Sequence, residues 1–338
     1  MERIVIYGAG NTGKSAYFYY KNRAECLFFV DSDEKKWGRE IAGLAIKSPS
    51  VLQTLKDVKV IIASVFWREI LDEIKGIPGL EIVLYEAGSK AMSNVINFTD
   101  NIETGLRERT IDLGAFFRKQ GEIICKELTF MSGNSLVLDY AFLKVLAEMY
   151  DCKTYLEIGT YIGESINILT DCCRKLYSIT APLEAPYSMR EWCKKRDIPD
   201  YSERLTYSEK ITHFFEDSRM FDYSKIDTEI DLFFIDGDHR YEGVYADSKN
   251  IFSVKRENAI IVWHDFRDGE LRFNEEVICA VKDAIGDEFQ KVYVTNCNCC
   301  GVYLPEAYIK DFKIKQLKYE DNTRLYTYDV ILKNCKII

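Results

Sequence analysis

The chain has 338 residues and, at roughly 150 residues per domain, is expected to form about two domains. Its 45 lysines and arginines against 54 aspartates and glutamates leave a net charge of −9, which argues against a broad basic surface for nucleic acid or an anionic membrane. Hydrophobic residues make up 47%, too many for a disordered chain. No apolar run approaches the ~18 residues of a membrane span, and no secretory signal is recognised, so we expect a cytoplasmic protein.

The 11 cysteines stand at irregular spacings, unlike those of a small secreted scaffold, and we expect reduced thiols. Cys297 and Cys300 alone have the close spacing of metal ligands. No second such pair completes a zinc site, so packed thiols are the expected state.

Strand and helix patterns alternate along residues 1–92, which predicts a small doubly wound α/β domain. The expected strands are Arg3–Tyr7, Leu27–Asp31, Val58–Ser64 and Glu81–Tyr85, with helical stretches at Ser15–Asn22 and Trp67–Ile74.

A glycine loop follows the first expected strand and opens a helix, and an acid ends the second strand. Such glycines let the backbone approach a phosphate at the helix N-terminus, and the acid accepts hydrogen bonds from a ribose. The loop also fits the P-loop pattern GxxxxGKS, but no metal-holding acid ends a neighbouring strand. A tight turn without ligand is a further alternative. The candidate nucleotide-binding residues are Gly8, Gly10, Asn11, Gly13 and Asp31.

Four segments of this domain, Ile4–Gly10, Phe29–Asp33, Lys36–Gly38 and Val60–Ser64, resemble a bacterial sugar-nucleotide-binding domain. That domain stands at the N-terminus of some sugar acetyltransferases and ahead of some methyltransferases. The resemblance implies a Rossmann-like fold that holds a nucleotide or nucleotide-sugar, or that serves assembly into a homodimer.

Residues 93–132 are charged and helix-like without strand runs, which predicts a helical connector that also roofs the next site. A second α/β series occupies residues 133–338 and ends in a C-terminal extension with an edge-strand pattern at Leu325–Leu332. Its expected elements are a helix at Leu136–Tyr150 and strands at Thr154–Ile158, Lys175–Thr180, Asp231–Asp236, Ala259–Trp263, Lys291–Thr295 and Val302–Leu304.

The segment Leu156-Glu-Ile-Gly-Thr-Tyr-Ile-Gly-Glu-Ser165 is an apolar strand with an acid, followed by a glycine turn into a helix. It resembles motif I of class I S-adenosylmethionine-dependent methyltransferases. The resemblance implies that the glycines contact the methionine part of the cofactor, with Glu157 near its amino group. The candidate cofactor-binding residues are Glu157, Gly159, Thr160, Tyr161, Gly163, Ser165, Thr180, Asp217, Ser218 and Asp236.

Two later segments, Phe234–Val244 and Ile260–Asp265, resemble motifs of metal-dependent O-methyltransferases, the group that includes macrolide-sugar O-methyltransferases and cephalosporin-hydroxylase-like proteins. Carboxyl ends of parallel strands meet in one crevice, where carboxylates and an imidazole suit Mg²⁺ or Mn²⁺. We expect Asp236 and Asp265 as metal ligands, His264 as a third, and His239 as the general base beside Asp236. A structural role remains the alternative for each histidine, and helix capping the alternative for Asp238.

Two positions depart from the family pattern. Thr180 stands where an acid usually holds the cofactor ribose, with Glu184 the nearest acid, and His264 stands where a carboxylate is more common. The resemblance therefore implies a metal-assisted S-adenosylmethionine-dependent O-methyltransferase acting on a hydroxyl of a carbohydrate or nucleotide-linked sugar. A catalytically degenerate nucleotide-sugar-binding protein of the same fold is the alternative. A nicotinamide-dependent oxidoreductase is disfavoured because the first domain is short and no Tyr-x-x-x-Lys stands beside its glycine loop.

Overall fold

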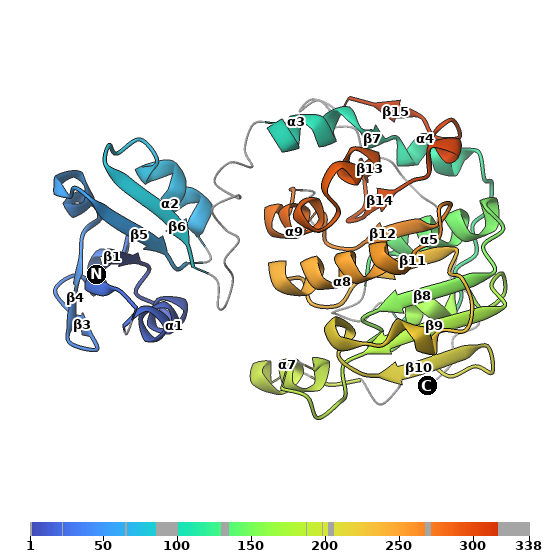
Figure 1. The fold of residues 1–338 in the computed structure, drawn as a ribbon, viewed down its shortest axis with the longest axis horizontal. Helices are drawn as coiled ribbons and strands as arrows, with labels where there is room; N and C mark the ends of the chain where they lie inside the picture. Colours follow the sequence, from blue (N-terminus) through green and yellow to red (C-terminus); the bar gives the residue numbers. More distant parts are fainter. Residues whose placement is uncertain are drawn as a thin grey trace. The chain divides into compact units, whose positions relative to one another are not determined.

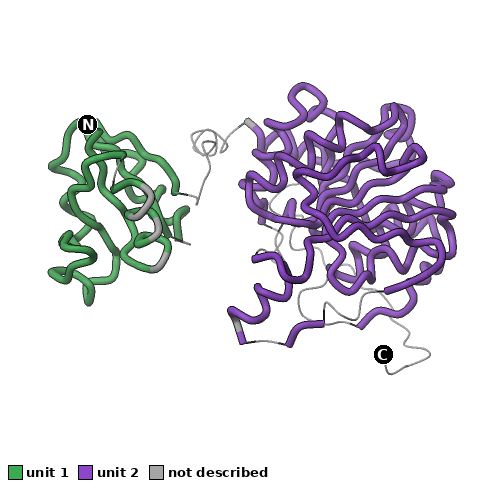
Figure 2. Tube along the Cα trace, turned by 60° about the horizontal axis from the view of Figure 1, so that its bottom comes forward, with its two compact units in different colours: residues 1–99 green, residues 100–338 purple. Residues whose placement is uncertain are grey.

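The structure is a computed structural model that describes residues 2–21, 23–64, 66–85, 101–129, 135–186, 188–197, 199–201, 206–267 and 272–316. The chain divides into two units, residues 1–99 and 100–338, each of which is described by itself (Figure 2). The edge strand expected within Leu325–Leu332 lies outside the described residues.

The first unit is a six-stranded sheet in the order β3-β4-β2-β1-β5-β6, in which only β3 and β4 pair antiparallel. Ile4 and Ile6 of β1 are fully buried and pack with Ala16 of α1 on one face of the sheet. The two strands that the sequence did not predict, β3 and β4, are short. The elements are β1 (Arg3–Tyr7), α1 (Asn11–Tyr20), β2 (Glu25–Val30), β3 (Glu40–Ile41), β4 (Leu44–Lys47), β5 (Val58–Ile62), α2 (Trp67–Ile74) and β6 (Leu80–Leu84), with 3₁₀ turns at Glu34–Lys36 and Pro49–Thr54.

The second unit is a nine-stranded sheet in the order β10-β9-β8-β11-β12-β14-β13-β7-β15 (Figure 1). Strands β10, β9, β8, β11 and β12 are parallel, and β14 is antiparallel to both of its neighbours. Its strands are β7 (Thr110–Ile111), β8 (Thr154–Ile158), β9 (Lys175–Thr180), β10 (Ile211–Phe215), β11 (Leu232–Ile235), β12 (Ile260–Trp263), β13 (Val292–Thr295), β14 (Gly301–Tyr303) and β15 (Ile314–Lys315).

The helices of this unit cover both faces of its sheet, as expected for a doubly wound α/β fold. They are α3 (Asn101–Glu108), α4 (Leu113–Arg118), α5 (Val137–Met149), α6 (Glu164–Asn167), α7 (Met189–Arg196), α8 (Tyr241–Val254), α9 (Glu275–Ile285) and α10 (Glu306–Ile309), with 3₁₀ turns η4 (Ser218–Met220), η5 (Tyr223–Lys225) and η6 (Gly286–Lys291).

Alternate residues of the central strands face the two helical layers. Phe234 and Val262 belong to the core that α5 covers, whereas the buried indole of Trp263 donates a hydrogen bond of 2.9 Å to the hydroxyl of Ser248 on α8. Helices α8 and α9 lie side by side (Figure 1). Since successive side chains of a strand point to opposite faces, Asp236 and His264 continue on the α5 side of the sheet.

The segment expected as a helical connector contains helices α3 and α4 and, in addition, a short strand of the second sheet. Its described residues include β7, which pairs with β13 and β15. The two-residue strand carries no periodic signal, which is why the sequence pattern did not predict it. The expected strands of the second unit form within one or two residues of their predicted ends, whereas β10 was not predicted.

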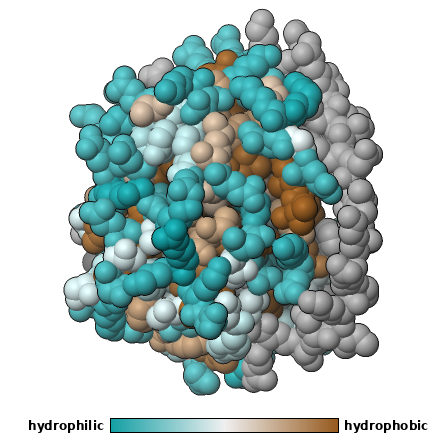
Figure 3. Space-filling model, turned by 90° about the vertical axis from the view of Figure 1, so that its right-hand side faces the viewer, coloured by the Kyte–Doolittle hydropathy of each residue, from teal (hydrophilic) through white to brown (hydrophobic). Residues whose placement is uncertain are grey.

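No disulfide is found among the cysteines that the structure describes. No helix within the described ranges is both long enough and apolar enough to cross a membrane. The face of the molecule seen in Figure 3 is mostly hydrophilic, with patches of apolar residues between the polar ones.

Candidate functional site

A cavity of about 790 Å³ opens at the carboxyl ends of β8, β9, β11 and β12. This is where the strand order reverses between β8 and β11, the position at which open α/β sheets bind ligands. The predicted cofactor and metal residues that line the cavity are Gly159, Thr160, Tyr161, Ser165, Thr180, Asp217, Ser218, Asp236, His239, His264 and Asp265.

The turn after β8 requires glycine. Gly159 has a φ of +87°, and a Cβ built on it would lie 2.1 Å from the carbonyl oxygen of Asp236. The β8 turn therefore packs backbone to backbone against the loop after β11. Gly163, at φ +83°, precedes the first residue of α6, so the turn directs the N-terminus of α6 toward the cavity.

Glu157 lies beneath this turn and is fully buried. Its Oε2 accepts hydrogen bonds from the hydroxyls of Ser165 at 2.7 Å and Tyr155 at 2.9 Å, whereas Oε1 is buried and has no hydrogen-bond partner. Burial raises the pKa of Glu157 to about 7, against the lowering effect of these hydrogen bonds. Glu157 is not among the side chains that form the cavity wall.

The end of β9 supplies hydroxyls where the sequence resemblance led us to expect an acid. Thr180, the last residue of β9, lines the cavity. The hydroxyl of Ser178, also on β9, lies 2.5 Å from the hydroxyl of Thr160. Glu184 is exposed and lies outside the lining of the cavity. The structure therefore gives no support to Glu184 as a replacement for the missing acid.

Residues of η4 and α8 also line the cavity. The carboxylate of Asp217 caps η4 and pairs with the guanidinium of Arg219 at 2.5 Å. Asp247 of α8 also lines the cavity, is only 1% exposed, and has a buried Oδ1 without a hydrogen-bond partner. Burial raises the pKa of Asp247 to about 7, although a hydrogen bond from Ser218 opposes the shift. No sequence pattern predicted Asp247 as a site residue, because it stands in the middle of a helix and outside every motif.

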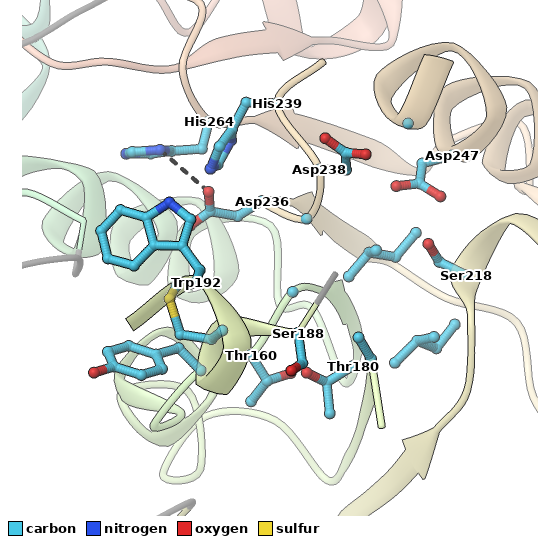
Figure 4. A pocket seen from close by; sticks show the side chains of 18 of the residues that line it. Thr160, Thr180, Ser188, Trp192, Ser218, Asp236, Asp238, His239, Asp247 and His264 are labelled. Atoms are coloured by element: carbon cyan, nitrogen blue, oxygen red, sulfur yellow. Dashed lines mark ion pairs between the residues drawn. The ribbon is translucent and has the colours of Figure 1, made fainter. Parts of the chain in front are cut away.

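Two histidines and two aspartates, Asp236 and Asp265, lie at the ends of β11 and β12. Figure 4 shows His239, His264 and Asp236 of this group. Nδ1 of His239 lies 2.5 Å from Oδ2 of Asp265. Nδ1 of His264 lies 3.3 Å from Oδ1 of Asp236 and 3.2 Å from Oδ1 of Asp265. Ligand atoms of Asp236, His239 and Asp265 all lie within 4.8 Å of one another.

The electrostatics of this cluster are strongly coupled. Burial lowers the pKa of His239, but the hydrogen bond to Asp265 and the charges of Asp265 and Asp236 outweigh it and raise the value to about 9. Burial alone would raise the pKa of Asp265, yet hydrogen bonds from both histidines hold it well below its usual range. The two carboxylates therefore favour the protonated form of His239.

The residues present fit a divalent cation. Nδ1 of His264 is buried and lies within 3.3 Å of carboxylate oxygens of both Asp236 and Asp265, so it offers a nitrogen ligand beside two oxygen ligands. Asp238, in contrast, accepts from the backbone N–H of Arg240 and pairs with its guanidinium at 2.5 Å. This agrees with a local structural role for Asp238 at the start of α8.

The glycine loop of the first unit is closely packed. A Cβ on Gly13 would lie 1.8 Å from the carbonyl oxygen of Gly8, whereas Gly10 has open space around it and Asn11 begins α1. The carboxylate of Asp31 already accepts from the N–H groups of Ala9 and Asp33 and from Lys36 Nζ, at 2.7, 2.9 and 3.0 Å. A ribose at Asp31 would compete with these donors.

Known proteins resemble both units. Residues 156–266 match a family model described as a methyltransferase domain, and residues 1–82 match one described as C2185-like, N-terminal. An uncharacterized protein, R132, of Acanthamoeba polyphaga mimivirus is 26% identical over 160 residues, 46% of this chain and 71% of that protein.

Solved structures resemble the chain at low identity. An O-methyltransferase from Bacillus cereus in complex with SAH is 16% identical, with 62% of this chain and 94% of that chain covered and a TM-score of 0.35. The TDP-rhamnose 3'-O-methyltransferase of calicheamicin biosynthesis is 13% identical, with 50% and 79% covered and a TM-score of 0.36.

The methyltransferase match begins in β8 and ends just after β12, so it spans the glycine turn and the converging aspartates and histidines. The second unit therefore carries a match to a methyltransferase domain, on a doubly wound α/β sheet.

Proposed function

We propose that this enzyme is an O-methyltransferase that acts, with the help of a divalent cation, on a hydroxyl of a carbohydrate or nucleotide-linked sugar. The observation that carries the proposal is the meeting of Asp236, Asp265 and His239 in the same cavity as the Gly159 turn. A hydroxyl is a poor nucleophile until its proton is removed, and this cluster supplies a base and anionic cation ligands at one place.

In the proposed reaction, the turn at Gly159 and the start of α6 hold the methionine part of the cofactor, and Asp217 and Ser218 border its adenine. Asp236 and Asp265 hold the cation, which when bound lowers the pKa of a neighbouring hydroxyl. His239 takes the proton of the acceptor hydroxyl, and the oxygen of that hydroxyl attacks the methyl group of S-adenosylmethionine in line. S-adenosylhomocysteine is the leaving group. A cation held by Asp265 would oppose the positive charge on His239 and so favour the neutral imidazole, which accepts this proton.

The sugar part of the proposal is supported by two features. Segments of the first unit resemble a sugar-nucleotide-binding domain, and the indole of Trp192, 41% exposed, lines the cavity as an apolar platform for a ring (Figure 4). For the first unit, taken by itself, we propose that Gly8, Gly10, Asn11, Gly13 and Asp31 bind a nucleotide, with Lys36 the side-chain donor that a ribose would displace.

The test is transfer of a labelled methyl group from S-adenosylmethionine to a panel of sugar nucleotides and free glycosides, with SAH binding measured by calorimetry on the same samples. We expect His239→Gln to lose methyl transfer and retain SAH binding. His213→Gln is the matched control, because His213 bonds to the carbonyl of Thr206 and does not line the cavity.

A second function is favoured by one observation, the hydroxyl of Thr180 where an acid is usual. If the protein binds sugar nucleotides but transfers no methyl group to any acceptor, the degenerate binding protein is the better description. If His239→Gln transfers methyl groups at the wild-type rate, the role proposed for His239 is wrong.

A further inference from the structure

We propose that His264 is a cation ligand through Nδ1, that Asp139 holds it in that orientation, and that this pair makes the site prefer a transition ion such as Mn²⁺ or Co²⁺ over Mg²⁺. The inference rests on the cation-assisted function proposed above.

The imidazole of His264 is held between two sets of carboxylates. Nε2 lies 3.2 Å from Oδ2 of Asp139, and because a carboxylate only accepts, Nε2 carries a hydrogen there. Nδ1, on the opposite side of the ring, is buried and lies 3.3 Å from Oδ1 of Asp236. Nδ1 also lies 3.2 Å from Oδ1 of Asp265, so one nitrogen and two carboxylate oxygens are close enough together to serve as ligands of the same cation.

Asp139 is well suited to orient the ring because burial and several hydrogen bonds hold its carboxylate in place. It is fully buried at the start of α5. Its Oδ2 also accepts from the backbone N–H of Leu136 at 2.7 Å, and Oδ1 accepts from the N–H of Cys299 at 3.0 Å and from the thiol of Cys300 at 3.3 Å. These donors come from α5 and from the loop before β14, so two distant segments position the carboxylate.

This arrangement matches a general feature of metal sites. A histidine ligand commonly donates its other ring N–H to a carboxylate, which fixes the tautomer and makes the ligating nitrogen more basic. Imidazole nitrogen favours transition ions, whereas Mg²⁺ prefers oxygen ligands and gives up water reluctantly. With Asp236 and Asp265 as the oxygen ligands, His264 shifts the site toward ions that accept nitrogen.

The experiment uses Mn²⁺ as the probe on the full chain. Pulsed electron paramagnetic resonance detects coupling between bound Mn²⁺ and an imidazole nitrogen, and ¹⁵N-histidine labelling verifies the source. We expect this coupling in the wild type and in His239→Gln, and its loss in His264→Glu, which still binds Mn²⁺. We also expect His264→Glu to shift the ratio of Mn²⁺ to Mg²⁺ affinity toward Mg²⁺ by about tenfold or more.

The role of Asp139 is tested by Asp139→Asn, which keeps the size of the side chain. We expect Mn²⁺ affinity to fall about 10- to 100-fold while SAH binding stays unchanged. Asp112→Asn is the matched control, since Asp112 is also a buried aspartate at a helix start, where it caps α4. Unchanged circular dichroism and melting temperature establish that each variant is folded.

The outcomes separate the inference from the proposed function. Bound Mn²⁺ without nitrogen coupling, or coupling that is lost in His239→Gln rather than in His264→Glu, overturns the inference alone. Equal Mn²⁺ affinity of Asp139→Asn and wild type overturns the positioning role. If the wild type binds no divalent ion and methyl transfer is insensitive to chelators, both the inference and the cation-assisted part of the function fail.

Discussion

Replacing Asp247 with asparagine removes a nearly fully buried carboxylate from the cavity wall while preserving its shape. The side chain is only 1% exposed, and burial is the main cause that raises its pKa from an ordinary 3.8 to about 7, with the charges of Asp238 and Asp217 adding to the shift. The folded-state pKa thus exceeds the unfolded value. The stabilising contribution is fully present below the unfolded pKa and is lost as the pH rises through about 7.

The size of the effect follows from the two pKa values. With 3.8 unfolded and about 7 folded, linkage predicts that this one group costs the folded state about 2.5 kcal/mol between pH 5 and pH 8. Asparagine carries no charge at either pH, so the variant escapes this loss. We therefore expect the stability of Asp247→Asn relative to wild type to rise by about 2.5 kcal/mol over that pH range.

The assay is urea unfolding at pH 5, 6, 7 and 8, followed by hydrogen exchange of peptides from β11 and β12, which reports on the second unit alone. Glu242→Gln is the control, because it removes an exposed carboxylate from the same helix. Parallel stability curves for wild type and Asp247→Asn across this range would refute the reasoning, since the carboxylate would then ionise as readily in the folded state as in the unfolded one.

Three further substitutions test the cavity. Gly159→Ala is expected to lower the free energy of unfolding by about 2 to 4 kcal/mol and to abolish SAH binding, whereas Gly105→Ala, in α3, keeps both; equal unfolding midpoints would contradict this. Thr180→Asp is expected to tighten SAH binding about tenfold, because a carboxylate accepts strong hydrogen bonds from ribose hydroxyls, and calorimetry showing weaker binding would place the ribose elsewhere. Trp192→Ala is expected to raise the acceptor KM about tenfold with little change in kcat; an unchanged KM would remove Trp192 from the acceptor site.

Local patterns accounted for most of the fold. The apolar runs of β11 and β12 are continuous because these strands are buried on both faces, so they were visible without any knowledge of the tertiary structure. The glycine turn was visible as well, because a positive φ at Gly159 leaves few alternatives to glycine. Short strands such as β7 and β15 were not predicted, since two residues carry no period and form only where a neighbouring strand offers hydrogen bonds.

The candidate site likewise contains residues that the sequence predicts and residues that only the tertiary structure reveals. Asp236, His239, His264 and Asp265 follow directly on predicted strands, and parallel strands bring their carboxyl ends together, so the sequence alone determined this group. Only the tertiary structure decided that Asp139, 125 residues from His264 along the chain, lies against its ring and that Asp247 enters the cavity wall. Both stand on helices whose local sequence indicates burial but not a partner, because the contact depends on how each helix packs on the sheet.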